Sequence, residues 1–274
     1  MSDISSITGD VAIVGVGNMG GAILAGLTQA GLMPQRIRAA AHSHTNQVAT
    51  QYGVVPAKDP AQAALGASVV IVAVKPPKVR EVVAQMAPHL SAGSLLISVA
   101  AGISTRDIEG WAQTPANPTP AVVRAIPNTP AKLRQGVTAM SRGAHVSDAQ
   151  LLTAQTVFGA VGAVVTVDES IMPAVSAVSG CGPAYLFLVA EAMTEAGVKL
   201  GLPREVAAKL VTQTFVGSSA LMATGESPYE LRAQVTSPGG TTAAAIFELE
   251  DRGVRAAFSA AMKATVDRTK ELAG

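Results

Sequence analysis

The segment VAIVGVGNMGG, residues 11–21, decides the fold of this chain. An apolar run typical of a buried strand leads into glycines at positions 15, 17 and 20, in the spacing GxGxxG, and a helix-like segment follows to about Gly31. In this setting the first glycine permits a tight turn, the second lets the backbone approach a pyrophosphate, and the third lets the helix pack closely on the strand. The segment therefore predicts a dinucleotide site around Gly15, Val16, Gly17, Asn18, Met19 and Gly20. The alternative is a glycine-rich turn in an α/β protein that binds no cofactor.

Further apolar runs extend this pattern at 36–42, 68–74, 95–100 and 122–126, with Ala-rich, helix-like segments between them. These runs are apolar at nearly every position, as expected when helices cover both faces of a parallel sheet. The alternation predicts an α/β fold with an open, doubly wound (Rossmann) parallel sheet.

The pattern changes at about residue 167, after which the apolar periodicity is helical over 184–200, 204–224, 241–250 and 254–272. We therefore expect two domains, a dinucleotide-binding domain over 1–167 and an all-helical domain over 168–274. The segment 184–200 is apolar on more than one face, so it needs cover on several sides. A second subunit would supply that cover, which predicts at least a homodimer and leaves a higher oligomer of dimers open. The alternative is the central helix of a monomeric bundle.

Composition narrows the function. The chain has 274 residues, and its 20 Lys and Arg nearly balance 19 Asp and Glu, leaving a net charge of +1. With only 3% aromatic residues, it lacks both the positive field and the stacking surfaces of a nucleic-acid-binding protein. The single Cys181 cannot form an internal disulfide or a thiolate metal site, so we expect a reducing compartment and no metal.

Two uncharged stretches, 11–35 and 171–190, are long enough to span a membrane. The first is interrupted by the glycine motif and Pro34, and the second by SGCGP at 179–183, so we expect no membrane span. The first ten residues carry no Lys or Arg, whereas a secretory signal has a basic leader. We therefore expect a cytoplasmic protein.

The choice of cofactor follows from an absence of acids. NAD sites usually place an acid at the end of the second strand, yet no Asp or Glu stands between Asp10 and Asp59. In its place after the second run are His42, Ser43, His44, Thr45 and Asn46. Of these we expect Ser43 and His44 to bind the 2′-phosphate, although each could also belong to an ordinary solvated loop. NADPH is therefore favoured, and because no arginine occupies this turn we expect a moderate preference in which NADH is still accepted.

Later strands end in small or proline-containing segments. Because ligands of doubly wound sheets bind at the carboxyl edge, these strand ends are further candidates for cofactor contacts. They are Ala73, Val74, Lys75, Pro76, Ala100, Ala101, Pro127 and Asn128.

Six strings occur in one order along the chain: IVGVGNMGGAI, VAVKP, ISVAAGIS, IPNTPA, VSGCGPAYLF and QVTSPGGTT. This series resembles the pyrroline-5-carboxylate reductase family from about residue 11 to about residue 270, most specifically over 231–250. The resemblance implies NADPH-dependent hydride transfer to C5 of a cyclic imine, giving proline in the last step of its biosynthesis. It also implies a Rossmann domain followed by a helical domain that interleaves with its partner in a dimer.

Site residues can be carried over one position at a time. The resemblance implies that Thr242 places its hydroxyl against the ring nitrogen and is the catalytic residue. It implies that the carboxylate is held by Ser237, Gly239, Gly240 and Thr241. Glu169 matches an acid that contacts proline, and Gln234 matches a position near the nicotinamide where the family often has a different amide or an acid. Cys181 replaces the usual serine, which puts a hydroxyl role there in doubt.

Elementary chemistry agrees with part of this assignment. SPGG at 237–240 is a turn that leads into a helix, so free backbone N–H groups and the positive end of the helix dipole suit a small carboxylate. The reduction needs no protein nucleophile, because the cofactor carries the chemistry. For Ser237 and Thr242 the alternative role is ordinary N-capping of that helix.

Two other classes of protein share this outline. A β-hydroxyacid dehydrogenase would need a helical lysine with an asparagine a few residues on, and Lys199 and Lys209 lack it. A nucleotide-sensing dimer would keep residues 15–20 but would need nothing special at 231–242, so the second motif argues against it.

Overall fold

The computed structural model describes residues 4–41 and 43–273. Contacts divide the chain into two compact units. The sheet unit comprises the described residues up to Gly180 together with those from Thr265 onward, and the helical unit comprises Cys181–Ala264. The sheet unit extends past the expected boundary at 167 because Met172, on the segment after the last strand, is buried against Ile126 and Ala139.

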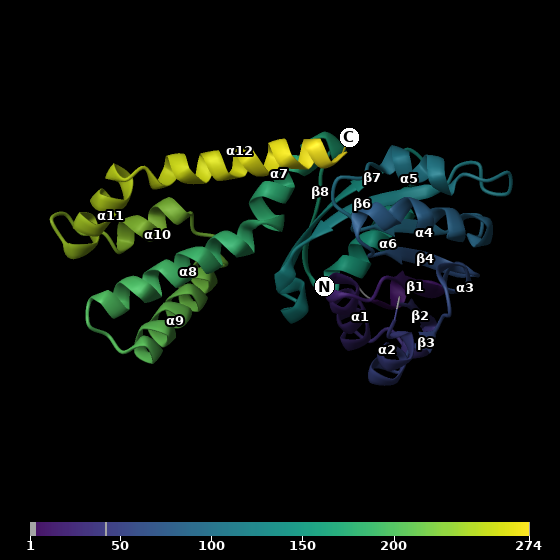
Figure 1. Ribbon diagram of the computed structural model, residues 1–274, viewed down its shortest axis with the longest axis horizontal. Coiled ribbons are helices and arrows are strands. Elements are labelled where there is room, and N and C mark those ends of the chain that lie inside the picture. The colour runs from purple at the N-terminus through teal and green to yellow at the C-terminus, as the bar shows by residue number, and fades with distance from the viewer. Residues whose placement is uncertain (1–3, 42, 274) are drawn as a thin grey trace. The chain divides into compact units, whose positions relative to one another are not determined.

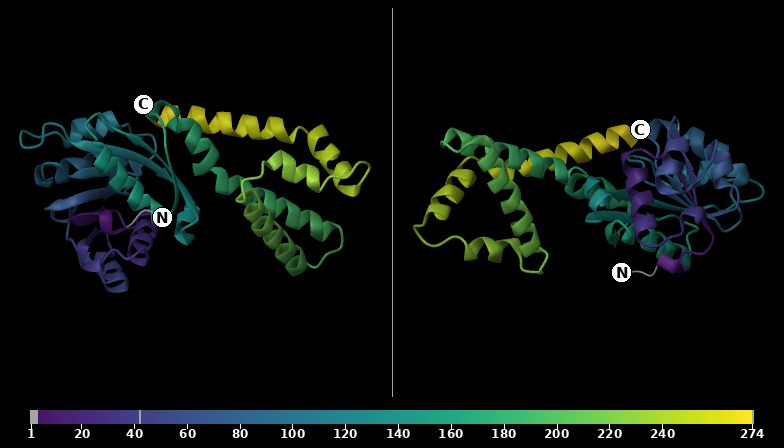
Figure 2. Two further views of the ribbon diagram at one scale, coloured as in Figure 1. Left: turned by 180° about the vertical axis from the view of Figure 1, so that it is seen from behind. Right: turned by 90° about the horizontal axis from the view of Figure 1, so that it is seen from below.

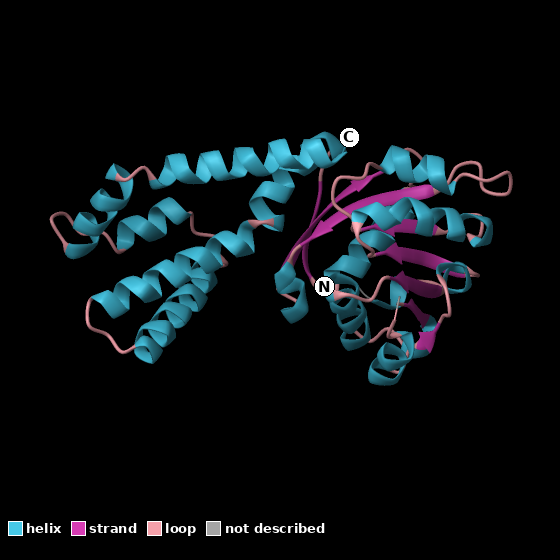
Figure 3. Ribbon diagram, viewed as in Figure 1, coloured by secondary structure: helices cyan, strands magenta, loops and turns pink. Residues whose placement is uncertain are grey.

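The described residues of the sheet unit form one eight-stranded sheet in the order β3-β2-β1-β4-β5-β6-β7-β8 (Figures 1 and 3). The strands are β1 Asp10–Val14, β2 Ile37–Ala40, β3 Val55–Pro56, β4 Ala67–Val72, β5 Leu95–Ser98, β6 Ala121–Pro127, β7 Gly136–Arg142 and β8 Gly162–Thr166. The chain reverses direction of winding between β1 and β4, which places a topological switch point beside the glycine motif. The predicted doubly wound fold is confirmed.

The strands that the sequence predicts pair in parallel, but the sheet also contains β7, which runs antiparallel to β6. Residues 128–135 connect the two strands, and a connection this short cannot carry the chain back for a parallel crossover. The short β3 and the strands β7 and β8 were also not expected as strands.

Helices cover both faces of the sheet, as the apolar runs predict (Figure 2). One face packs against α1 Asn18–Gln29, α2 Thr45–Tyr52 and α6 Asp148–Gly159. The other packs against α3 Pro60–Ala64, α4 Val79–Met86 and α5 Thr105–Ala112. Short 3₁₀ helices complete the connections: η1 Ile4–Ser6, η2 Pro34–Arg36, η3 Pro76–Lys78, η4 Ala87–His89 and η5 Thr129–Leu133.

The helical unit contains α8 Gly182–Lys199, α9 Arg204–Met222, α10 Pro228–Gln234, α11 Thr241–Asp251 and the first part of α12 Val254–Ala273. The four predicted helices are confirmed to within a few residues, and α10 is additional. Every residue of α8 is described and none is buried, with Phe187 68% exposed. This exposure does not fit the central helix of a monomeric bundle.

The string SGCGP interrupts the regular α-helix, as expected, but it does not end the helical segment. A nearly continuous helical segment, Glu169–Lys199, combines η6 Glu169–Ile171, α7 Met172–Val175, a π-helical turn Ser176–Gly180 and α8. The wider π turn accommodates the glycine-rich string, and Pro183 lies in the first turn of α8, where its missing N–H leaves no bond unmade. Within the described residues this is the one helix whose length and mean hydropathy of 1.5 would allow it to cross a membrane. A helix that a second subunit covers meets the same criterion.

Candidate functional site

The glycine motif forms a tight loop at the carboxyl ends of β1 and β4. Gly15 has a φ of +94°, and a Cβ there would lie 2.7 Å from the backbone carbonyl of Ala73. A Cβ on Gly20 would overlap the carbonyl oxygen of Gly15, so helix and strand pack as closely as the motif predicts. Gly17, by contrast, faces open space and caps α1 without a side-chain hydrogen bond. The first-turn N–H groups of α1 are therefore accessible to a pyrophosphate.

A pocket of about 730 Å³ opens beside this loop and gathers the ends of β1, β2 and β4. We call it the strand-end pocket. Six predicted cofactor residues besides His44 line it: Gly15, Val16, Gly17, Ala73, Val74 and Lys75. Its lining also includes residues that the sequence pattern does not predict, among them Lys58, Asp59, Lys78 and Glu81. Nothing local in the sequence marks these residues, because they reach the pocket from the β3–α3 connection, from η3 and from α4.

A second pocket, of about 600 Å³, lies beyond the end of β2, and we call it the β2 pocket. Ser43 and His44 line it from the turn after β2, and Thr45 and Asn46 from the start of α2. Pro56 of β3, Ala57 and Lys58 of the β3–α3 connection and Gln62 of α3 line its other side. His42 lies outside the described residues. The sequence predicts no acidic residue at the end of β2, but Asp59 from the β3–α3 connection lines the strand-end pocket. Its Oδ1 accepts a 2.8 Å hydrogen bond from the N–H of Gln62.

The remaining cofactor candidates of the sheet unit lie at strand and helix ends. Asn18, Met19 and Gly20 form the first turn of α1, Pro76 opens η3, Ala100 and Ala101 follow β5, and Pro127 ends β6. Asn128 is 9% exposed, and its side chain already has two structural partners. Its Oδ1 accepts from the N–H of Val137 at 2.9 Å, and its Nδ2 donates to the carbonyl of Ser179 at 3.2 Å. A cofactor role for Asn128 stays a prediction.

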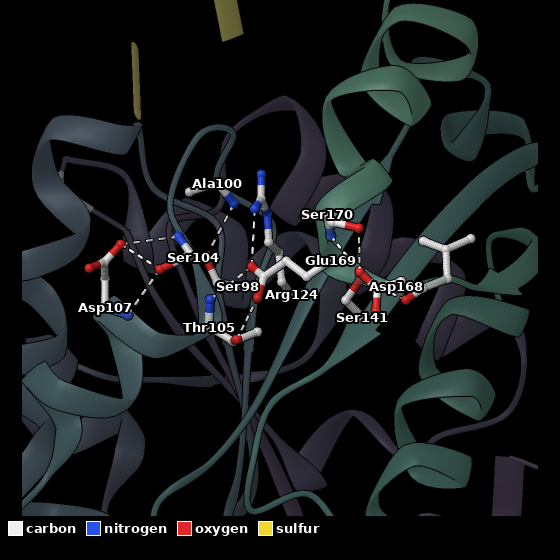
Figure 4. A network of polar contacts seen from close by, with 11 residues as sticks. Ser98, Ala100, Ser104, Thr105, Asp107, Arg124, Ser141, Asp168, Glu169 and Ser170 are labelled. Carbon is white, nitrogen blue, oxygen red and sulfur yellow. Dashed lines mark hydrogen bonds and ion pairs between the residues drawn. The ribbon is translucent and has the colours of Figure 1, made fainter. Parts of the chain in front are cut away.

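Glu169 lies at the centre of a polar network in the sheet unit (Figure 4). Its Oε1 accepts from the N–H of Thr105 at 2.9 Å and lies 3.1 Å from Nη1 of Arg124. Its Oε2 accepts from the Thr105 hydroxyl at 2.6 Å. Arg124 is only 6% exposed, and its Nε has no partner among the described residues. A substrate contact would therefore have to use the remaining lone pairs of Glu169, and it stays a prediction.

Sequence reasoning missed Arg124, although a signal was present. A single charge stands within VVRAI, an otherwise apolar strand of a sheet covered on both faces. A buried charge is seldom retained without a partner.

In the helical unit, the turn between α10 and α11 carries the predicted substrate residues. Gly240 precedes α11 and caps it without any side-chain hydrogen bond, and Thr241 and Thr242 begin the helix. The turn is closed by a 3.0 Å bond from the N–H of Gly240 to the carbonyl of Ser237, and Gly239 has a φ of +68°. Neither Ser237 nor Thr242 is therefore the N-cap. The first-turn N–H groups have no side-chain acceptor and can bind an anion.

Charged side chains join the two helices that flank this turn. Arg232 on α10 lies 3.5 Å from Glu250 on α11, which also contacts Arg255 at 2.7 Å. The hydrogen bond from Arg255 holds the pKa of Glu250 below its ordinary value. Gln234 donates from Nε2 to Oε2 of Glu226 at 2.6 Å, so its nicotinamide role stays a prediction. Cys181 precedes α8 and is partly exposed.

A glycine cradle at the switch point of a doubly wound sheet, followed in the chain by a helical unit, defines a two-domain dinucleotide-dependent oxidoreductase. Residues 10–102 match the family model of NADP oxidoreductase, coenzyme F420-dependent, and residues 169–272 match that of pyrroline-5-carboxylate reductase dimerisation. The pyrroline-5-carboxylate reductase of Corynebacterium melassecola is 43% identical over 268 residues, covering 96% of this chain and 98% of the relative. The chain belongs to the pyrroline-5-carboxylate reductase family.

Solved structures agree with this assignment. A pyrroline-5-carboxylate reductase from Coxiella burnetii superposes with a TM-score of 0.91 at 38% identity, covering 98% of this chain and all of that one. Plasmodium falciparum pyrroline carboxylate reductase, solved with NADP bound, gives a TM-score of 0.86 at 27% identity, covering 97% of this chain and 99% of that one. The predicted family and fold are confirmed, and the two alternative classes of protein are set aside.

Proposed function

We propose that this chain reduces 1-pyrroline-5-carboxylate to L-proline with NADPH, the last step of proline biosynthesis. Membership of the family supports the reaction. The observation that carries the substrate assignment is the start of α11, where the first-turn N–H groups have no side-chain cap and two threonines follow Gly240. A small carboxylate with an adjacent ring nitrogen suits this arrangement.

NADPH, when bound, supplies the hydride that C5 of the imine accepts. The C=N double bond becomes a single bond, and the nitrogen takes up a proton from solvent water and becomes more basic. In this proposal the hydroxyl of Thr242 hydrogen-bonds that nitrogen, and the Thr241 N–H, with Ser237 and Gly239, holds the carboxylate, while the N–H of Gly240 closes the turn onto the Ser237 carbonyl. The Gly15–Gly20 loop binds the pyrophosphate. These groups supply position and charge, and no protein nucleophile or metal takes part.

The same proposal covers the assembly and the location of the enzyme. The exposed apolar side chains of α8, among them Leu186, Phe187 and Leu188, belong to the segment that matches the dimerisation model and support at least a homodimer. The dimerisation and substrate-binding part of the chain comprises residues 169–272, which match the dimerisation model and include the whole helical unit. We place the enzyme in the cytoplasm with NADPH preferred over NADH.

The assay that tests the reaction follows NADPH with three substrates, as its consumption with each of two imines and as its formation with a hydroxyacid and NADP. Pyrroline-5-carboxylate should be reduced efficiently, while a six-membered cyclic imine and a hydroxyacid with NADP should react much more slowly. A faster reaction with the hydroxyacid would overturn the proposal, and a faster reaction with the larger imine would overturn the substrate assignment alone.

A pair of variants tests the role of Thr242. Thr242→Ala removes one hydrogen bond that strengthens as hydride adds, so kcat should fall about ten- to a hundredfold, more than substrate affinity does. Thr242→Ser keeps the oxygen and should retain most activity. Unchanged kcat in the alanine variant would mean that the hydroxyl has no catalytic role.

A further inference from the structure

The strand-end pocket and the β2 pocket share three lining residues: Ala41, His44 and Lys58. Ala41 follows β2 directly, and Lys58 belongs to the connection between β3 and α3. In doubly wound dinucleotide-binding sheets, the adenosine ribose lies beyond the end of the second strand, where its 2′ oxygen is recognised. The junction of the two pockets is therefore the place where a 2′-phosphate would lie.

The arginines closest in sequence to this junction are already engaged elsewhere. Arg38 on β2 pairs with Asp10 through Nη2 at 2.7 Å and also donates to the carbonyl of Leu65. Arg36 donates to the carbonyl of Ile7 at 2.6 Å and to that of Gly9. Because these guanidinium groups hold the chain around β1, they do not supply charge to the pocket.

His44 reaches the junction but is oriented by the glycine loop. Its Nε2 lies 3.0 Å from the carbonyl oxygen of Val16. A carbonyl can only accept, so Nε2 carries the hydrogen of this bond. On a neutral ring Nδ1 is then a lone-pair acceptor, which repels phosphate oxygens instead of binding them. In the neutral tautomer that carries its hydrogen on Nε2, His44 therefore has no hydrogen to donate to a phosphate at this place.

Lys58 supplies the positive charge that Arg36, Arg38 and His44 do not bring to this junction. Of the described residues that line the β2 pocket, it alone is a lysine or arginine. Its backbone N–H donates to Oε1 of Gln62 at 2.6 Å, which fixes the start of the connection from which its side chain extends. In the strand-end pocket the other lysines are Lys75, after β4 across the switch point, and Lys78, which pairs with Glu81 at 2.9 Å.

We propose that Lys58 is the residue that selects NADPH, by placing its ammonium group against the 2′-phosphate at the junction of the two pockets. This inference rests on the proposed use of NADPH. A lysine at this place accounts for the proposed preference for NADPH over NADH. The turn after β2 does not explain that preference alone, because it holds no arginine. The contact is a charge-assisted hydrogen bond from a flexible, exposed side chain, so it should weaken as salt is raised.

Calorimetric titration of the intact enzyme with two fragments tests this, without any need for turnover. The fragments are adenosine 2′,5′-bisphosphate, which carries the 2′-phosphate, and 5′-AMP, which does not. Lys58→Gln should weaken the bisphosphate about tenfold and change 5′-AMP less than twofold. Lys58→Arg should restore most of the affinity. The matched control is Lys270→Gln, which removes an exposed lysine of α12 that lines neither pocket and should change neither titration.

The outcomes separate this inference from the function on which it rests. If the wild type prefers the bisphosphate and Lys58→Gln keeps that preference, the assignment of Lys58 is wrong while the proposed use of NADPH stands. Equal weakening of both fragments would also overturn the assignment, because it would indicate a distorted pocket. If the wild type shows no preference, the proposed choice of cofactor fails as well. In steady state, Lys58→Gln should raise the KM for NADPH about tenfold, with the KM for NADH unchanged.

Discussion

Removal of the Glu169 carboxylate should destabilise the sheet unit much more than it weakens substrate binding. This carboxylate accepts both hydrogen bonds of Thr105 at the start of α5 and faces the guanidinium of Arg124 on β6. The side chain of Arg124 is 7% exposed, whereas that of Glu169 is 27% exposed. Glu169→Ala therefore leaves a cation inside the protein with no counter-charge and with its Nε still unpartnered.

The size of the effect follows from this burial. Breaking a buried ion pair by removing one partner costs about 3–5 kcal/mol. Because water can reach the place of Glu169, we take the lower end, about 3 kcal/mol. In a domain of this size each kcal/mol lowers Tm by roughly 2–4 °C, so Glu169→Ala should lower the Tm of the sheet unit by about 6–12 °C. Glu169→Gln, which keeps an acceptor for Thr105, should lose about half as much.

Matched variants locate the cause. Replacing both partners, Arg124→Met with Glu169→Met, removes the buried charge and should recover most of the lost stability. Scanning calorimetry measures Tm, and kcat and KM are measured well below the transition. A Glu169→Ala variant that kept the wild-type Tm and raised the substrate KM more than tenfold would contradict this prediction, since that result belongs to a side chain that contacts substrate.

Three further predictions concern assembly, the glycine loop and pH. Dilution should reduce specific activity and Tm together if the enzyme is at least a dimer, and full activity at a light-scattering mass of 27.6 kDa would contradict this. Gly20→Ala should abolish NADPH binding in a titration, because its Cβ would overlap the Gly15 carbonyl. The control is Gly110→Ala in α5, where an added Cβ meets no other atom. That variant should raise the free energy of unfolding by about 0.5–1 kcal/mol, measured from a melting curve. The Ser227 hydroxyl and N–H hold the pKa of Glu230 below its ordinary value, so their stabilisation is complete above that value and is lost as pH falls through the lowered pKa. The Tm difference between wild type and Ser227→Ala should therefore shrink in acid, and a difference independent of pH would contradict the assignment.

Much of this protein is determined by its sequence alone, because the relevant signals are local. Continuous apolar runs predict β1, β2, β4, β5 and β6, because a strand that helices cover on both faces buries nearly all of its side chains. The glycine spacing determines the cradle, because Gly15 adopts a φ of +94° and a Cβ on Gly20 would overlap the Gly15 carbonyl. Helical periodicity and the order of short motifs likewise determine the helical unit and the family.

The tertiary structure decided what depends on pairing across long separations. The antiparallel course of β7 follows from its short connection to β6, and the π turn lets one helix pass through a glycine string that looks like a break. Glu169 meets Thr105 and Arg124, and Lys58 meets the end of β2, only because the order of the strands brings distant segments to one edge or one face of the sheet. Residue types and their spacing do not predict these contacts, because strand order and register, rather than local conformation, determine which side chains become neighbours.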